Sequence, residues 1–501
     1  MPKRGKIRRA RGRGKGAADP FRNGARGTIF ACATIRVFPR SVPPAWKPPF
    51  ARSSTARALQ VQSPMSRISP VRAAMAAALV LASACTELSD RPSNRAIAAL
   101  TAELVPARAE ARAAPAPRPA PPRERVPPIV RGIYVSSYAA GNPVSRNKLL
   151  ALTDSTELNA WVVDVKDEDG VRHHSKLPLA REASHWGSIR VHDLRALADT
   201  LKAHDIYPIA RVVVFKDPRL SRARPDWSIK TPGRELWRDH QRITWVSPWD
   251  RRVWEYNIQV AEEAARAGFR EIQFDYVRFP EAYRSLPTQV HPMEAGGRGD
   301  AIAAFLEEAA RRLRPLGVTV TADVFGLSMN ESKDVGIGQQ WEQLSSRVDG
   351  LLPMVYPSHY FPTHLAGVSR PNRMPYETVF RSVGMGVIRN QRLADAGREP
   401  ARIVPWLQAF TATWNDRSFK YGPRQAADQI RAVHDLGLED WIFWHPTSKY
   451  DAVAGAFARE ARPQARRFTP PPALVRTVDR FDREGAAAMR ATPVPSEALG
   501  Q

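Results

Sequence analysis

Residues 271–280 have the sequence EIQFDYVRFP, which combines the pattern of a buried strand with charged side chains. Apolar and aromatic residues run through it, yet Asp275 lies in the middle and an arginine follows three positions later. Successive side chains of a strand point to opposite faces. If Gln273 and Asp275 point inward, Phe274 and Tyr276 face the layer outside. The stretch therefore predicts a buried strand whose carboxyl end carries a functional carboxylate.

Seven further apolar runs of similar length accompany this strand. They span residues 129–137, 160–167, 207–215, 318–326, 350–357, 402–410 and 440–446. Continuous apolar runs are typical of parallel strands that are buried on both faces. Amphipathic patterns between them predict helices, most clearly at 190–206, 250–269, 299–317 and 423–438. Eight strand-then-helix units over roughly 330 residues predict an α/β fold, a (β/α)₈ TIM barrel at 129–461.

An open, doubly wound sheet is the main competing fold. Such sheets bind nucleotides through a glycine-rich loop between the first strand and its helix. No loop of that kind follows any of the eight apolar runs. The barrel is therefore the favoured prediction.

In a TIM barrel, the carboxyl ends of the strands supply the functional side chains. Several of the predicted strands end in charged, amide or aromatic residues. We interpret these as substrate-binding residues: Asp164, Lys166, Lys216, Asp217, Arg278, Tyr356, His359, Trp406, Gln408 and Trp444. Sugars present hydroxyl groups to carboxylates and amides, and apolar C–H faces to aromatic rings. The set predicts a carbohydrate site.

Asp275 and Asp323 are the predicted catalytic pair, because they lie at equivalent depth on neighbouring strands. Parallel strands are about 4.8 Å apart, and retaining glycosidases hold their two carboxyl groups roughly 5–5.5 Å apart. We expect Asp275 to be the nucleophile, held ionised by Arg278 or Lys166. Asp323 would be the acid/base, with its pKa raised by burial and by its like-charged neighbour. A structural or sugar-binding role for either aspartate is the alternative.

Taken with VVDVKDEDG (162–170), ARVVVFKDP (210–218) and TADVFG (321–326), the stretch EIQFDYVRFP resembles a bacterial glycoside hydrolase family first described as a domain of unknown function. The resemblance covers roughly residues 129–450. It implies a TIM-barrel glycosidase related to the alpha-amylase-like enzymes, with Asp275 as the nucleophile. The sequence has Asp323 where amylases have a glutamate, so Asp164 or Glu281 remains an alternative acid/base.

The formal charge of +25 is concentrated in the N-terminal segment. Residues 1–130 contain 24 lysines and arginines but 6 acidic residues, which accounts for +18 of the total. Residues 1–64 predict a disordered basic extension, or an artefact of the gene model if Met65 or Met75 is the true start. Nucleic-acid binding is the weakest hypothesis, because a basic patch on the folded part would be expected.

Residues 65–85 have the pattern of a secretory signal peptide. Two arginines precede an apolar run, and the segment ends in LASAC, which resembles a bacterial lipoprotein signal with lipidation at Cys85. Residues 86–128 predict a Pro/Ala-rich linker, and 462–501 a low-complexity tail. The sequence predicts an exported cell-envelope lipoprotein, anchored to the membrane if Cys85 is lipidated.

These observations predict a glycoside hydrolase acting on an envelope or extracellular polysaccharide. A non-catalytic glycan-binding barrel lipoprotein is the alternative from another class. No cofactor and no metal site is predicted. The acidic run 167–169 is favoured as a solvated loop, with calcium binding through its carboxylate oxygens as the alternative.

Overall fold

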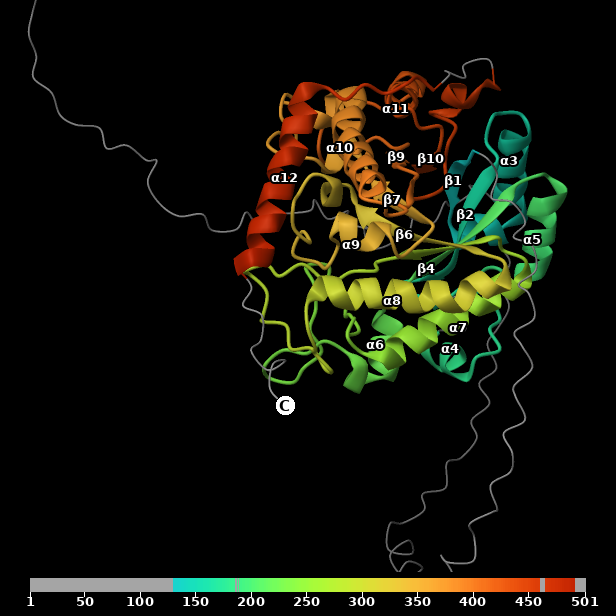
Figure 1. The fold of residues 1–501 in the computed structure, drawn as a ribbon. Coiled ribbons are helices and arrows are strands. Elements are labelled where there is room, and N and C mark those ends of the chain that lie inside the picture. Colours follow the sequence, from blue (N-terminus) through green and yellow to red (C-terminus); the bar gives the residue numbers. More distant parts are fainter. Residues whose placement is uncertain (1–128, 185–186, 188, 460–464, 492–501) are drawn as a thin grey trace, which may run out of the picture. The chain divides into compact units, whose positions relative to one another are not determined.

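The computed structural model describes residues 129–491 apart from 185–186, 188 and 460–464. The predicted N-terminal extension, signal segment, linker and Cys85 lie outside the described residues. In the described part, strands alternate with helices along the chain (Figure 1). No helix there is long and apolar enough to cross a membrane.

Eight parallel strand positions form a closed barrel, as the sequence predicts. The strands are β1 (Arg131–Val135), β2 (Ala160–Asp167), β4 (Tyr207–Val213), β5 (Glu271–Asp275), β6 (Thr319–Phe325), β7 (Gly350–Met354), β8 (Arg402–Ile403) with β9 (Trp406–Gln408), and β10 (Trp441–Trp444). β1 pairs with β2 on one side and with β10 on the other, which closes the ring. An open sheet is thereby excluded. The short β3 (Gly170–Val171) pairs antiparallel with the end of β2.

Helices follow the strands in each repeat. The longer ones are α3 (Pro143–Asp154), α5 (Leu194–Ala203), α7 (Arg251–Ala267), α8 (Arg298–Leu313), α10 (Pro375–Asp395) and α11 (Pro423–Asp435). The shorter ones are α2 (Ser137–Gly141), α4 (Pro178–Ala183), α6 (Pro218–Ala223) and α9 (Trp341–Ser345). Helix α7 shows why the boundaries fall where they do. Asp250 caps its first turn by accepting from the Arg252 amide, and Gly268 ends it at φ 112°, where glycine is favoured.

The strands bury both of their faces. Phe274 of β5 points outward and packs edge-on against Phe305 of α8, with ring centroids 5.2 Å apart. A second apolar cluster, which includes Val162, Ile209 and Leu352, fills the barrel interior. Neighbouring residues of a strand thus serve two separate cores, which explains the continuous apolar runs in the sequence.

Helix α12 (Pro472–Ala491) departs from our interpretation of residues 462–501 as a tail. Leu474, Val478 and Phe481 are buried, and their spacing places them on one helical face. This face packs against α10 (Figure 1). Gly384 of α10 permits the close approach, because a Cβ there would lie 3.0 Å from a methyl carbon of Leu474.

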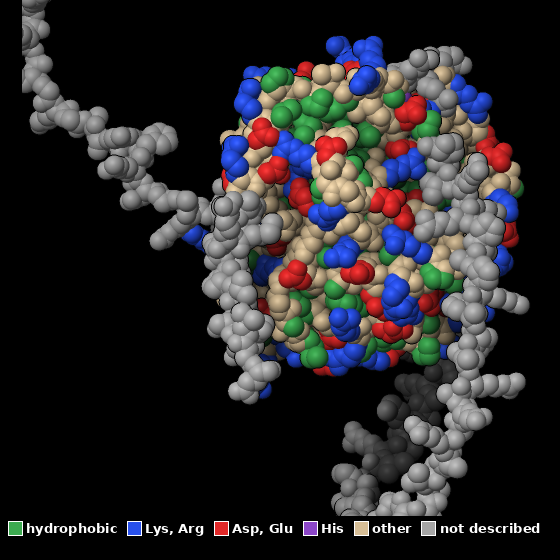
Figure 2. Space-filling model, viewed as in Figure 1, with side chains coloured by type: hydrophobic (Ala, Val, Ile, Leu, Met, Phe, Trp, Pro, Cys, Tyr) green, Lys and Arg blue, Asp and Glu red, His purple; other side chains and the backbone are tan. Residues whose placement is uncertain are grey.

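Charged side chains of both signs cover the barrel face seen in Figure 2. Charged side chains of the described part of the chain often form ion pairs, as Arg312 does with Glu262 at 2.7 Å and Arg224 with Glu182 at 2.5 Å. The described side chains on this face are interspersed rather than gathered into one basic patch.

Candidate active site

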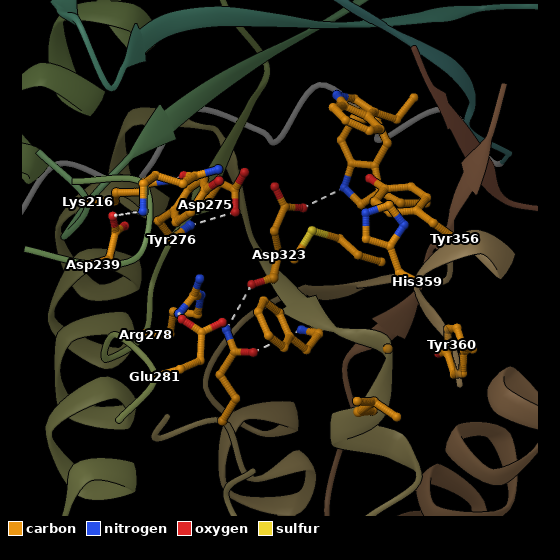
Figure 3. A pocket seen from close by; sticks show the side chains of 18 of the residues that line it. Lys216, Asp239, Asp275, Tyr276, Arg278, Glu281, Asp323, Tyr356, His359 and Tyr360 are labelled. Carbon is orange, nitrogen blue, oxygen red and sulfur yellow. Dashed lines mark hydrogen bonds and ion pairs between the residues drawn. The ribbon is translucent and has the colours of Figure 1, made fainter. Parts of the chain in front are cut away.

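A cavity of about 230 Å³ opens at the carboxyl end of the barrel strands. Eight of the residues predicted for the site line it: Asp275, Asp323, Lys216, Arg278, Tyr356, His359, Trp406 and Trp444. In Figure 3 the carboxyl groups of Asp275 and Asp323 both point into this space. The strand ends therefore bring together side chains that lie up to 228 positions apart in the sequence.

Asp275 ends strand β5 and is held by Arg211, which the sequence analysis did not single out. The Arg211 guanidinium donates to Asp275 Oδ2 from Nε at 2.9 Å and from Nη2 at 2.5 Å. Its third nitrogen, Nη1, donates to Asp164 Oδ1 at 2.6 Å. Arg211 is an inward-facing residue of a buried strand, and that unusual position is the sequence signal that could have identified it.

Tyr276 lies in the cavity rather than against the surrounding helices, contrary to our expectation. Its backbone has φ 48°, a left-handed conformation that interrupts the alternation of the strand. The Tyr276 amide donates to Asp275 Oδ1 at 2.5 Å, and Lys216 Nζ lies 4.7 Å from the centre of the tyrosine ring. The turn immediately after strand β5 thus contributes to the site.

Asp323 belongs to β6, the neighbour of β5 in the barrel. Its Oδ1 accepts from Gln273 Nε2 at 2.5 Å and from Trp406 Nε1 at 2.6 Å. Burial, and secondly the negative charge of Asp275, raise the pKa of Asp323 well above its usual range. Both causes favour the protonated form of Asp323. Because both hydrogen bonds fall on Oδ1, Oδ2 is the atom that can carry a transferable proton.

Arg278 and Glu281 form one wall of the cavity. Arg278 Nη1 donates to Glu281 Oε2 at 3.0 Å. Its guanidinium lies over the rings of Phe325 at 4.6 Å and Trp245 at 4.9 Å. Arg278 does not hold Asp275 in place as we expected; Arg211 does. Glu281, the alternative acid/base, lies within the same cavity but is paired with Arg278.

Aromatic rings form the opposite wall. The Tyr356 ring lies 5.2 Å from that of Trp444 and 5.5 Å from that of His359. Burial lowers the pKa of His359 to about 4, so this imidazole is neutral at neutral pH. One wall of the cavity is thus charged, and the other is aromatic and uncharged (Figure 3).

The predicted substrate-binding residues Asp164 and Lys166 lie below the cavity, not in it. A β-bulge interrupts the pairing of β2 with β4 between these two positions. They therefore do not share a face as strict alternation would require. Asp164 accepts from the Tyr134 hydroxyl at 2.5 Å and from Arg211. Lys166 Nζ pairs with Asp217 and donates to the Val213 carbonyl, so it does not hold Asp275 either.

Asp217 and Gln408 are likewise structural in their contacts. Asp217 Oδ2 lies 2.8 Å from Lys166 Nζ, and its Oδ1 caps helix α6 through the amide of Leu220. Gln408 Oε1 accepts from the Ser358 amide at 3.0 Å, and its Nε2 donates to the Phe410 carbonyl at 2.9 Å. Both side chains are fully buried, and neither reaches the cavity.

Two long segments, 224–250 and 276–297, supply cavity residues that sequence reasoning missed. Asp239, His240 and Gln241 come from the first, and Tyr283 from the second. The rings of His240 and Tyr283 meet with centroids 4.3 Å apart, which joins the two segments. Neither segment has a regular period, so no sequence pattern could have predicted this meeting.

The acidic run 167–169 is surrounded by basic groups. Arg172 approaches Asp167 at 3.2 Å, Arg219 donates to Asp169 at 3.1 Å, and Lys216 lies 3.8 Å from Glu168. Among the described residues no group of three or more histidine, cysteine, aspartate or glutamate side chains is arranged to hold a metal ion.

Residues 132–450 match the family described as "Putative glycosyl hydrolase domain". The chain belongs to this family. The match covers the barrel from β1 to the loop after β10 and includes every residue that lines the cavity. The predicted membership of a TIM-barrel glycosyl hydrolase family is confirmed. The more distant relation to the alpha-amylases stays a prediction.

Several solved structures resemble this glycosyl hydrolase. A hypothetical protein from Ruminiclostridium thermocellum is 34% identical, with 38% of this chain and 97% of that chain covered and a TM-score of 0.35. The glycoside hydrolase domain of PgaB (BpsB) from Bordetella bronchiseptica is 14% identical over 66% of this chain and 99% of that chain, with a TM-score of 0.45. That of PelA from Pseudomonas aeruginosa is 12% identical over 65% and 98%, with a TM-score of 0.35. No curated protein matches the chain.

Proposed function

We propose that the protein hydrolyses O-glycosidic bonds of a polysaccharide by a retaining mechanism, with Asp275 as nucleophile and Asp323 as acid/base. One observation carries the proposal. Two carboxyl groups from adjacent strands face one cavity, and the more buried environment of Asp323 raises its pKa while Asp275 is paired with a guanidinium. Two carboxyl groups with different protonation states are what glycoside hydrolysis requires.

In the first step, an Asp275 oxygen attacks the anomeric carbon while Asp323 gives its proton to the glycosidic oxygen. The bond to the leaving sugar breaks, and a glycosyl ester of Asp275 forms. In the second step, Asp323 accepts a proton from water, the resulting hydroxide attacks the anomeric carbon, and the ester bond to Asp275 breaks. The spacing of adjacent parallel strands, about 4.8 Å, supports the retaining separation of roughly 5–5.5 Å.

The change of role of Asp323 follows from its surroundings. The charge of Asp275 is one cause of the raised pKa of Asp323. Formation of the glycosyl ester removes that charge, so the pKa of Asp323 falls when it must act as a base. Arg211 contacts Asp275 from below through two nitrogens and keeps its carboxylate in position.

We further propose that the enzyme is exported and anchored to the cell envelope through lipid on Cys85. The signal-like segment 65–85 and the linker 86–128 support this placement. The substrate would then be an envelope or extracellular polysaccharide built of neutral or amino sugars. Radiolabelled palmitate incorporation into the full chain and into the Cys85→Ser variant tests the anchor. Equal labelling of both proteins contradicts it.

Reducing-sugar release from a panel of bacterial and plant polysaccharides tests the activity. The full chain, Asp275→Asn and the control Asp451→Asn are compared; Asp451 is an exposed residue paired with Lys148. We expect release by the wild type and the control, and none by Asp275→Asn. NMR of the first product shows whether the anomeric configuration is retained. Release that survives in Asp275→Asn contradicts the assignment. Glycan binding without release by any of the three proteins favours the alternative, a non-catalytic glycan-binding barrel.

A further inference from the structure

An exposed tryptophan lies beside the cavity but does not line it. Trp414, in the loop 409–422 between β9 and α11, has 46% of its surface exposed. Its indole stacks on the ring of Phe410, with centroids 5.7 Å apart and planes inclined by 22°. Phe410 is buried. One face of the Trp414 indole therefore contacts the protein, while nearly half of the residue is exposed.

Trp414 is connected to the cavity through ring contacts. Its indole meets His359 at 6.1 Å, and Phe410 meets Trp444 at 5.1 Å. His359 and Trp444 both line the cavity and both contact Tyr356. An uninterrupted row of rings thus leads from the aromatic wall of the cavity to the surface.

The loop that carries Trp414 is fixed in place by polar contacts. Asn415 Nδ2 donates to the Ser358 carbonyl at 2.9 Å. Arg373 donates to Asp416 at 2.6 Å and to the Ser418 hydroxyl at 2.6 Å. These bonds tie the loop to the segment after β7. An exposed indole on an anchored loop loses little conformational freedom when a ligand stacks on it.

The size of the cavity indicates why a sugar-binding position outside it would be needed. Pockets for drug-sized ligands span roughly 300–1,000 Å³, so a cavity of about 230 Å³ holds one sugar unit rather than several. The remaining units of a polysaccharide must then lie outside it. A flat apolar ring surface is suited to the C–H face of a pyranose. Trp414 lies at the end of the ring row and contacts His359, which lines the cavity, so its indole is next to the cavity.

We propose that Trp414 is a sugar-binding platform outside the cavity, which stacks on a pyranose unit of the polysaccharide chain next to the unit held inside. The inference rests on the proposed function, since it supplies that site with a second binding position. It predicts an enzyme that prefers chains of several sugars to single glycosides. Binding energy gained at Trp414 serves to hold the chain across the catalytic pair.

Affinity electrophoresis tests the platform separately from catalysis. Full-length protein is run in gels that contain glycol chitin, starch, arabinoxylan or galactan, in the Asp275→Asn background so that the polymer stays intact. We expect the polymer that retards the parent protein to bind the Trp414→Ala variant about tenfold more weakly. Trp414→Phe should restore most of the retardation. Tyr138→Ala serves as control, because Tyr138 is equally exposed but contacts Arg172 and Arg190 instead of the ring row.

The outcomes separate the two proposals. Trp414-dependent binding by a protein whose wild type releases no sugar supports the platform and removes the hydrolase. Hydrolysis of a polymer that Trp414→Ala binds as tightly as its parent supports the hydrolase and overturns the platform. The platform is also overturned if the parent and Trp414→Ala are retarded equally in every gel, or if no gel retards either protein. A parallel assay measures hydrolysis of an aryl monoglycoside, which occupies the cavity alone. The platform requires that Trp414→Ala keeps this activity, because its loss would mean that the substitution disturbs the cavity.

Discussion

The two ends of strand β5 carry carboxyl groups in contrasting surroundings. Asp275, at the carboxyl end, lies in the open cavity beside Asp323. Glu271, four residues earlier, lies at the opposite end of the barrel in a cavity of about 130 Å³. Its Oε1 accepts from the Thr321 hydroxyl at 2.8 Å. Burial raises the pKa of Glu271 to about 7.

The comparison shows that a raised pKa does not by itself mark a catalytic acid. Burial is the leading cause for both Glu271 and Asp323. Both cavities contain a second carboxyl group, which is Asp349 in the case of Glu271. What distinguishes Asp323 is its position at the carboxyl end of the strands, in a cavity with a wall of rings that suits a sugar. No aromatic ring of the described residues lines the cavity of Glu271. The carboxyl end of a barrel is where chemistry is expected, and the amino end is where stability is decided.

Asp275→Asn gives the largest expected effect on the active end. The amide cannot form the glycosyl ester, so kcat/KM should fall by at least about 10⁴-fold. The rate of sugar release measures it, and thermal unfolding monitors the fold. Added azide, which replaces the missing nucleophile, should restore part of the rate. A loss of less than about tenfold would sink the nucleophile assignment.

Asp323→Asn should lower the rate by about 10²–10⁴-fold, because proton donation to the leaving group is lost. Aryl glycosides with an acidic leaving group need no proton and should lose less. The sign of the pH effect follows from the raised pKa of Asp323. The wild type should be active at neutral pH and lose activity as rising pH deprotonates Asp323. The variant should lack this alkaline decline, and an identical decline in both proteins would exclude Asp323 as the acid.

Glu271→Gln tests the other end of the barrel through stability. The folded protein binds the Glu271 proton up to pH about 7, whereas the carboxyl group of the unfolded chain loses it near its usual pKa of 4.5. Stability should therefore fall as pH rises between these values, and by roughly 3 kcal/mol in total. The glutamine has no proton to lose. We expect the variant to be more stable than wild type at pH 8 and equal to it at pH 4.

Urea unfolding of both proteins across this pH range measures the difference. Activity provides the control, because a residue of the structural end should leave kcat and KM unchanged. A variant that is less stable at pH 8 would mean that the ionised carboxylate has favourable partners. A variant that loses activity would remove the distinction between the two ends.

The sequence alone predicts the barrel because the patterns that indicate its strands and helices are local. Eight apolar runs separated by amphipathic stretches leave few folds open, and all eight strands form within the expected ranges. Helix α12 escaped prediction because Leu474, Val478 and Phe481 are sparse in a segment rich in Pro, Arg and Ala. Its partner surface on α10 depends on tertiary packing, which no local period indicates.

The candidate site could be predicted where strict alternation holds. Asp275, Asp323, Tyr356 and Trp406 reach the cavity because they follow the inward register of their strands. The prediction for Lys166 failed at a β-bulge, which shifts the register by one residue. Cavity residues from the long irregular segments were missed for a different reason. Their positions depend on contacts between segments rather than on a repeating pattern.

Asp164→Asn should give the smallest effect and decide what a buried carboxylate beneath the cavity does. Asp164 contacts Arg211 and the Tyr134 hydroxyl, and burial raises its pKa. Without its charge, Arg211 is oriented from one side only, so kcat should fall roughly tenfold while KM changes little. A substrate-binding residue would instead raise KM. Tyr134→Phe is the matched control, since it removes the other partner of Asp164 and leaves the ion pairs of Arg211 intact. If Asp164→Asn raises KM and Tyr134→Phe does not, Asp164 contacts the substrate. The substrate-binding part of the barrel would then include the layer of Asp164, which we assign to the structural layer beneath the cavity.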